Sequence, residues 1–155
     1  PGSLPSETAA ALSAIKPANV VICGGENSVS AAVESTLQSW VYGSPTVVRK
    51  SGSGRYDTAL ALIRYGRQLS GVDRPNGIFA ATGTNFPDAL AGGVLAGAGA
   101  GVWRPLMLVD PVDAEARSPQ IKAFMDENPG MNFATVLGGD RTVGENVREY
   151  ILGLL

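Results

Sequence analysis

The chain has 155 residues, 45% of them hydrophobic and 17% charged, with a formal net charge of −2. This composition is typical of one globular domain and excludes a disordered or fibrous protein. The small negative charge argues against nucleic acid as a partner. Histidine is absent, which removes Ser-His-Asp and Cys-His catalysis. Since no apolar run reaches the roughly 20 residues of a membrane helix, we expect no membrane span.

The predicted elements alternate between helices and short apolar strands. In chain order they are a helix at 5–15, a strand at 19–23, a helix at 28–37, a strand at 45–49, a helix at 57–69, a strand at 77–82, a helix that begins near 87, a strand at 105–110, a helix at 119–127, a strand at 133–138 and a helix at 143–152. This order predicts an α/β fold with one parallel sheet of about five strands and helices on both faces. The single cysteine, Cys23, lies in the first strand, and we expect its thiol to be buried and inert.

The two ends of the chain repeat each other at an offset of 114 residues, as from Gly24 to Gly138. In both places an apolar strand ends in two glycines and a helix follows, so we expect equivalent strand-to-helix turns. We therefore interpret residues 1–155 as a single module, with one repeat period of about 114 residues and the start of the next, taken from a longer protein.

The most distinctive stretch is ATGTNFPDAL at 81–90, which joins a predicted strand to a helix. Gly83 permits a tight turn, and Pro87 suits the first turn of a helix. Asp88 places a carboxylate where the helix dipole favours negative charge. Strand-to-helix corners of this kind commonly form ligand sites in α/β folds.

Two polar loops supply the candidate ligand-binding residues, because both follow predicted strands whose carboxyl ends we expect at one sheet edge. The candidates are Arg49, Arg55, Tyr56, Asp57, Asn85 and Asp88. The alternative is structural, with one of the two arginines paired to an aspartate across the loops. In particular we expect Asp88 to form an ion pair with Arg49 or Arg55.

The residues alone also allow a second kind of site, a metal site. Asp110 and Asp113 leave one strand end together and, with Glu26, offer carboxylates for Mg²⁺ in a Toprim-like phosphoryl-transfer or hydrolase domain. Nucleotide binding is disfavoured, because the glycine-rich turns lack both the Gly-x-Gly-x-x-Gly and the P-loop patterns. We expect no cofactor and no metal, and carboxylates that act as solvated caps.

Four motifs, in order, resemble those of the type 2 cell-wall-binding repeat family (CWB2) of Gram-positive surface proteins. They are GGENSVS at 24–30, RKSGSGRYDTA at 49–59, NFPDAL at 85–90 and PLMLVD at 105–110. The resemblance implies a Rossmann-like or Toprim-like fold and a non-catalytic, extracellular module that anchors a surface protein to an anionic secondary cell-wall polymer. It also implies further modules of the same chain or oligomer as partners.

This chain departs from the family pattern at two places. Gly54 stands where the family usually has an aspartate before the Arg-Tyr pair, so a carboxylate partner for that arginine is in doubt. The segment 97–104 is longer than usual, and we expect Trp103 and Arg104 to be displayed on the outside.

Overall fold

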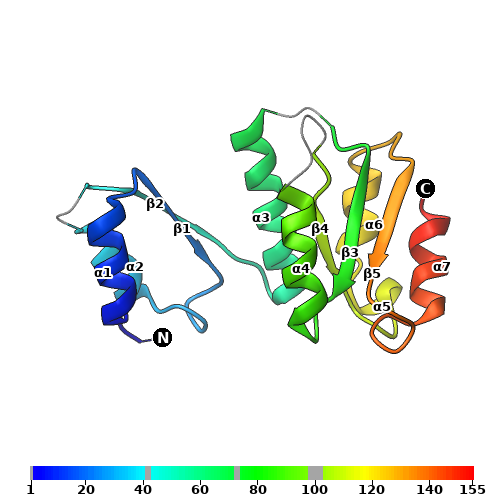
Figure 1. Cartoon of the computed structure of the whole chain (residues 1–155), viewed down its shortest axis with the longest axis horizontal. Helices are drawn as coiled ribbons and strands as arrows, with labels where there is room; N and C mark the ends of the chain where they lie inside the picture. Colours follow the sequence, from blue (N-terminus) through cyan, green and yellow to red (C-terminus); the bar gives the residue numbers. More distant parts are fainter. Residues whose placement is uncertain (1, 41–42, 72–73, 98–102) are drawn as a thin grey trace. The chain divides into compact units, whose positions relative to one another are not determined.

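The computed structural model describes residues 2–40, 43–71, 74–97 and 103–155 (Figure 1). The chain divides into two compact units, Pro1–Gly54 and Arg55–Leu155, each with its own sheet and hydrophobic core. In the described residues, no helix combines the length and the apolar character needed to cross a bilayer.

The first unit contains two helices and two parallel strands. They are α1 (Ser6–Ile15), β1 (Asn19–Cys23), α2 (Ala31–Gln38) and β2 (Thr46–Lys50). Its core is Ile22 of β1 with Val33 and Leu37 of α2, and Leu12 of α1 packs against the same cluster. Both helices therefore cover the same face of the two-stranded sheet.

Cys23 is exposed, and the prediction of a buried thiol is wrong. Side chains alternate along a strand, so Ile22 faces the helices while Val21 and Cys23 point to the opposite face. The prediction assumed a strand buried on both faces, whereas the helices of this unit cover only one.

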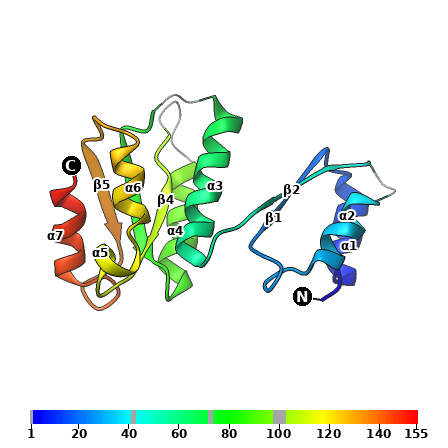
Figure 2. The same cartoon turned by 180° about the vertical axis from the view of Figure 1, so that it is seen from behind.

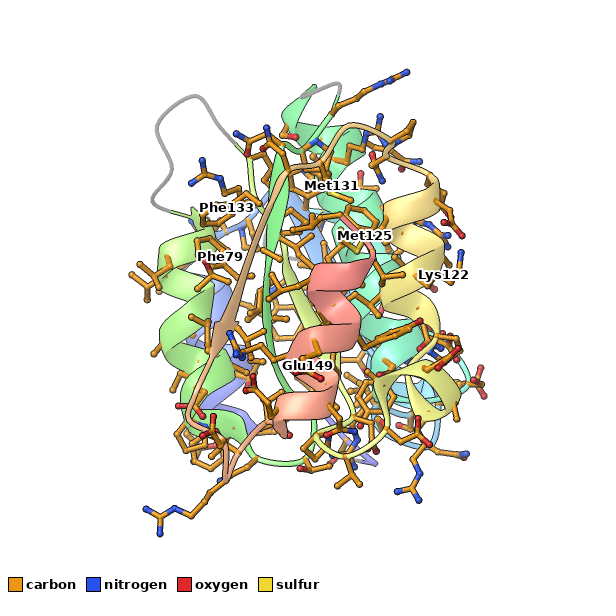
Figure 3. All side chains as sticks on the ribbon, turned by 90° about the vertical axis from the view of Figure 1, so that its right-hand side faces the viewer. Phe79, Lys122, Met125, Met131, Phe133 and Glu149 are labelled. Atoms are coloured by element: carbon orange, nitrogen blue, oxygen red, sulfur yellow. The ribbon has the colours of Figure 1, made fainter. Side chains whose placement is uncertain are left out.

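The second unit contains a three-stranded parallel sheet in the order β4-β3-β5. Its elements are α3 (Arg55–Ser70), β3 (Gly77–Thr82), α4 (Phe86–Gly97), β4 (Leu106–Val109), α5 (Ala114–Arg117), α6 (Gln120–Asp126), β5 (Phe133–Leu137) and α7 (Glu145–Gly153). The helix α4 lies on one face of this sheet, and α3, α6 and α7 lie on the other (Figures 2 and 3). The main core lies under these three helices, where Ile78, Met107 and Phe124 are almost completely buried.

All five strands form close to the predicted residues, but the prediction of one five-stranded sheet is wrong. β1 and β2 pair with each other, and β3 pairs with β4 and β5 in a separate sheet. Apolar runs identify strands locally, whereas pairing depends on contacts between distant segments that the runs do not encode. The α/β class, the parallel pairing and the helices on both faces of the β4-β3-β5 sheet are as predicted.

The predicted equivalence of the two Gly-Gly turns is confirmed. Gly24 and Gly138 directly follow β1 and β5, and both have positive φ angles, of 119° and 103°. In each turn the second glycine's carbonyl accepts from the N–H groups three and four residues later. The donors are Ser28 at 2.9 Å and Val29 at 3.0 Å in the first turn, and Thr142 at 2.8 Å and Val143 at 3.0 Å in the second.

Helix α4 packs on the sheet through a glycine. Gly92 is buried, and a Cβ at this position would overlap Leu137 and crowd Leu106. The helix approaches the strands closely only because this side chain is absent. On another face of α4 the side chains of Phe86, Leu90 and Val94 are exposed, by 74%, 71% and 72%.

Trp103 and Arg104 are not displayed outside, which corrects that prediction; residues 98–102 of the same segment lie outside the described residues. Trp103 is partly buried against the main core. The Arg104 guanidinium lies 4.5 Å from the centre of the Phe133 ring, and its Nε donates to Asn76 Oδ1 at 2.9 Å. A cation–aromatic contact and a hydrogen bond therefore hold the Arg104 side chain in place.

The Gly138 turn generates a stability prediction. Gly138→Ala is expected to lower the free energy of unfolding by at least about 1–2 kcal/mol, because left-handed backbone disfavours a Cβ and this Cβ would overlap Thr142 and Asp88. Gly139→Ala is the matched control, since nothing lies within 4 Å of its Cβ position. Denaturant unfolding measures both variants, and equal losses would contradict the account.

Candidate functional site

The carboxyl ends of β3, β4 and β5 surround a cleft of about 450 Å³ in the second unit. Parallel strands bring the loops that follow them to one edge of the sheet, where open α/β folds form ligand crevices. The side chains that line it are Thr82, Thr84, Asn85, Pro111, Val112, Asp140, Arg141, Thr142 and Asn146. They combine one arginine and one aspartate with hydroxyl, amide and apolar groups.

Hydrogen bonds order the loop after β3 and join the loops after β4 and β5. Thr84 donates its backbone N–H to Thr82 Oγ1 at 3.2 Å, and the two hydroxyl oxygens are 2.9 Å apart. Across the cleft, Asn146 Nδ2 donates to Val112 O at 2.7 Å. Gly144 N–H donates to Pro111 O at 2.9 Å, so the loop after β5 is tied to the loop after β4.

Arg141 supplies a cation to this cleft. Its side chain is exposed, and it has no hydrogen bond or ion pair in the described part of the chain. By contrast, Arg148 pairs with Glu145 and Arg64 pairs with Glu127. The guanidinium of Arg141 is therefore available to an anionic group.

Arg49, the first of the predicted ligand residues, is bound within the first unit. Its Nε donates to Glu34 Oε2, and its Nη1 donates to Gly24 O and Val29 O, all at 2.8 Å. The side chain is only 13% exposed. The guanidinium thus joins β2 to the Gly-Gly turn and to the start of α2.

Removing Arg49 should destabilise the first unit. Arg49→Ala leaves Glu34 and two carbonyl groups partly buried without their donor, and a loss near the ~3–5 kcal/mol of a broken buried pair is expected. Trp40 fluorescence in a Trp103→Phe background reports on this unit, because the two tryptophans lie in different units. Glu26→Gln, an exposed position in the same unit, is the control. A loss of unfolding free energy within about 1 kcal/mol, as for an exposed ion pair, would contradict a structural role for Arg49.

Arg55, Tyr56 and Asp57 begin α3 and fasten it to neighbouring loops. Arg55 Nη1 donates to Gly83 O, and the Tyr56 ring fills the space that a Cβ on Gly83 would need. Asp57 Oδ1 accepts from Gln120 Nε2 at 2.5 Å. The contacts of Arg55 and Tyr56 with Gly83 set the position of the β3–α4 loop, from which Asn85 reaches the cleft, whereas Asp57 joins α3 to the start of α6.

Asp88 is half-buried at the start of α4, and its carboxylate lies beside Gly138. No ion pair joins it to Arg55 among the described residues of the second unit, so that predicted pair is not found. Arg49 pairs instead with Glu34 of its own unit. The Asp88 carboxylate has no hydrogen bond or ion pair in the described part of the chain.

The structure brings only Asn85 of the six predicted residues to the cleft lining. The ligand role of the six remains a prediction. Sequence reasoning missed Arg141 and Asn146, which follow the second Gly-Gly turn. The repeat offered a signal for them, since it predicts a strand-to-helix turn at Arg141 and the start of a helix at Asn146.

Asp110 and Asp113, the carboxylates considered for a metal, act as caps. Asp110 Oδ1 accepts from the N–H groups of Val112 and Asp113 at 3.0 Å each, and Asp113 Oδ1 accepts from Ala116 N–H at 3.0 Å. In the described residues, no three His, Cys, Asp or Glu side chains form a group that could hold a metal ion.

Burial alone would raise the pKa of Asp110, but hydrogen bonds from the N–H groups of Asp113 and Val112, helped by Arg117 and Tyr56, outweigh it. The pKa of this carboxyl group is therefore lowered. A lowered folded-state pKa means that the ionised carboxylate contributes stability above its unfolded pKa of about 3.9. That contribution is lost as the pH falls through the folded-state value.

Asp110→Asn should therefore reduce the free energy of unfolding at pH 7, and the difference from the unchanged chain should shrink below a pH of about 4. Denaturant unfolding at pH 7 and at acid pH measures both. Asp140→Asn, at an exposed position, is the control. A difference that stays constant with pH would show that the charge of Asp110 does not contribute.

Comparisons with known proteins agree with this fold. The family model described as cell wall binding domain 2 (CWB2) matches residues 49–148. Among solved structures, Cwp6 from Clostridium difficile superposes on 98% of this chain with a TM-score of 0.75 and 22% sequence identity. The superposed part is 22% of the length of the Cwp6 chain. At this identity the likeness concerns the fold alone. The comparison with curated proteins gives no match.

The family match extends over most of the chain and includes three of the four sequence motifs, at 49–59, 85–90 and 105–110. This chain belongs to the cell wall binding domain 2 family.

Proposed function

We propose that this chain is a non-catalytic module that anchors a surface protein outside the cell by binding an anionic secondary polymer of the cell wall. The family is one of cell-wall-binding domains, which supports the general role. The observation that carries the finer proposal is the exposed guanidinium of Arg141 at a cleft of about 450 Å³ that also offers amide and hydroxyl groups.

The chemistry of the cleft suits a charged polysaccharide. A guanidinium binds phosphate or carboxylate oxygens through two parallel hydrogen bonds, which suits the charged groups of such a polymer. The amides of Asn85 and Asn146 and the hydroxyl of Thr84 are suited to sugar hydroxyl groups. With a net charge of −2, the chain depends on local cations rather than on its overall field.

Within this proposal, the residues predicted from sequence have two roles. Asn85 contacts the polymer directly. Arg55 and Tyr56 act as positioning residues, since they hold the start of α3 against the loop that carries Asn85, and Asp57 fixes the same helix end to α6.

A binding experiment tests the proposal. Arg141→Ala should weaken binding to purified cell walls by about 10- to 150-fold, as expected when a hydrogen bond to a charged group worth roughly 1.5–3 kcal/mol is lost. Arg148→Ala is the matched control, because this arginine also follows the second Gly-Gly turn but is paired with Glu145. Walls from which the anionic polymer has been extracted should bind both variants and the unchanged chain equally weakly.

Two outcomes would contradict the proposal. Equal binding by the Arg141→Ala and Arg148→Ala variants would remove Arg141 from the site. Undiminished binding to polymer-extracted walls would exclude the anionic polymer as the ligand. Melting temperatures of all variants are measured alongside, so that a loss of folded protein is not mistaken for a loss of binding.

Protein–protein interaction is a second candidate function, and the exposed residues Phe86, Leu90 and Val94 favour it. They recur at every fourth position of α4 and form an apolar stripe. In this alternative the stripe binds another repeat of the same kind. Leu90→Ser should then convert an oligomer into a monomer in sedimentation experiments, while binding to the cell wall per chain stays unchanged.

A further inference from the structure

The repeat reveals a strand edge that differs between its two copies. In the first unit β1 pairs with β2, whereas β5, its equivalent at the offset of 114, pairs only with β3 among the described strands. We infer that the second edge of β5 is a binding surface for a parallel strand of another repeat, with the apolar-apolar-arginine pattern of Val47 to Arg49. This inference is independent of the cleft and of the proposed polymer.

The backbone of β1 shows how such a strand binds. Ala18 O accepts from Thr46 N–H at 2.9 Å, and Gly24 N–H donates to Lys50 O at 2.8 Å. Alternate residues of a strand direct their polar groups to the same edge, so the even-numbered residues of β1 face β2. Their equivalents with an N–H at the open edge of β5 are Ala134, Val136 and Gly138.

The Gly-Gly turn supplies the second part of the surface. In the first unit Arg49 reaches from β2 to the carbonyl oxygens of Gly24 and Val29. Because the two turns share their hydrogen bonds and their positive φ angle, Gly138 and Val143 present equivalent carbonyl groups. An arginine on the incoming strand therefore finds the same two acceptors.

The charge partner is not repeated, but another acid is close to the site. Glu34, which pairs with Arg49, corresponds to Arg148 in the second copy. Asp88 instead places a half-buried carboxylate beside Gly138, with no ion pair in the described part of the chain. The incoming arginine pairs with Asp88 in place of a glutamate, which makes the surface selective for strands that carry this arginine.

The test adds a second β2 strand to the chain. Residue 155 corresponds to residue 41 at this offset, so a copy of residues 42–54 appended after Leu155 places the second β2 in register. Amide hydrogen exchange at Ala134, Val136 and Gly138 should then slow by about tenfold, the upper part of the range expected for a net hydrogen bond. The amides of Phe133, Thr135 and Leu137, which face β3, are the internal controls.

Two variants test the arginine. In the extended chain, alanine at the appended copy of Arg49 should abolish most of the added protection. Asp88→Asn should do the same in the extended chain while it leaves exchange at these amides unchanged in the original chain. Combining the two changes should reduce the added protection no further than either change alone, as expected for two members of one ion pair.

Unchanged exchange at Ala134, Val136 and Gly138 in the extended chain would overturn the inference. Protection that survives both the arginine and the Asp88 changes would also overturn it, since the edge would then accept any strand.

Discussion

The pairing of β3 with both β4 and β5 is the constraint on which the second unit depends. It directs three strands the same way, so the loops after all three meet at one edge. The close approach of α4 through Gly92 covers one face of this sheet, and α3, α6 and α7 cover the other. The cleft at the carboxyl ends follows from this arrangement, because the loops after the strands bring Thr84, Asn85 and Arg141 to one edge.

The sequence was sufficient for the local elements and for the repeat. Short apolar runs located the five strands, and paired glycines located the turns, because each feature depends on a few neighbouring residues. The arrangement of strands into sheets was not predictable in this way. Nothing in the run Asn19–Cys23 indicates that it pairs with β2 alone, and for the same reason the exposure of Cys23 was missed.

The ligand role of the predicted site residues remains a prediction, but the structure shows contacts of Arg49 and Arg55 that the sequence did not. Arg49 lies near the end of β2 and Arg55 follows that strand, as a ligand-binding residue would, but whether a guanidinium is free depends on acceptors elsewhere in the chain. Arg49 finds Glu34 and the carbonyl groups of a Gly-Gly turn, and Arg55 finds Gly83 O. A sequence motif locates an arginine without showing whether its donors are already used.

The repeat shows how the arginine contacts relate to the Gly-Gly turns. A Gly-Gly turn has a positive φ angle and carbonyl groups directed outward, and in the first unit an arginine from the next strand binds them. The arginine thereby links one structural segment to the strand that leads into the next helix. Arg49, which a sequence motif marks as a candidate for ligand binding, thus joins segments of the first unit. Arg141 has no ion pair in the described part of the chain and remains available for a ligand. In this fold, the arginines that hold the chain together and the arginine that can bind an anion come from different loops.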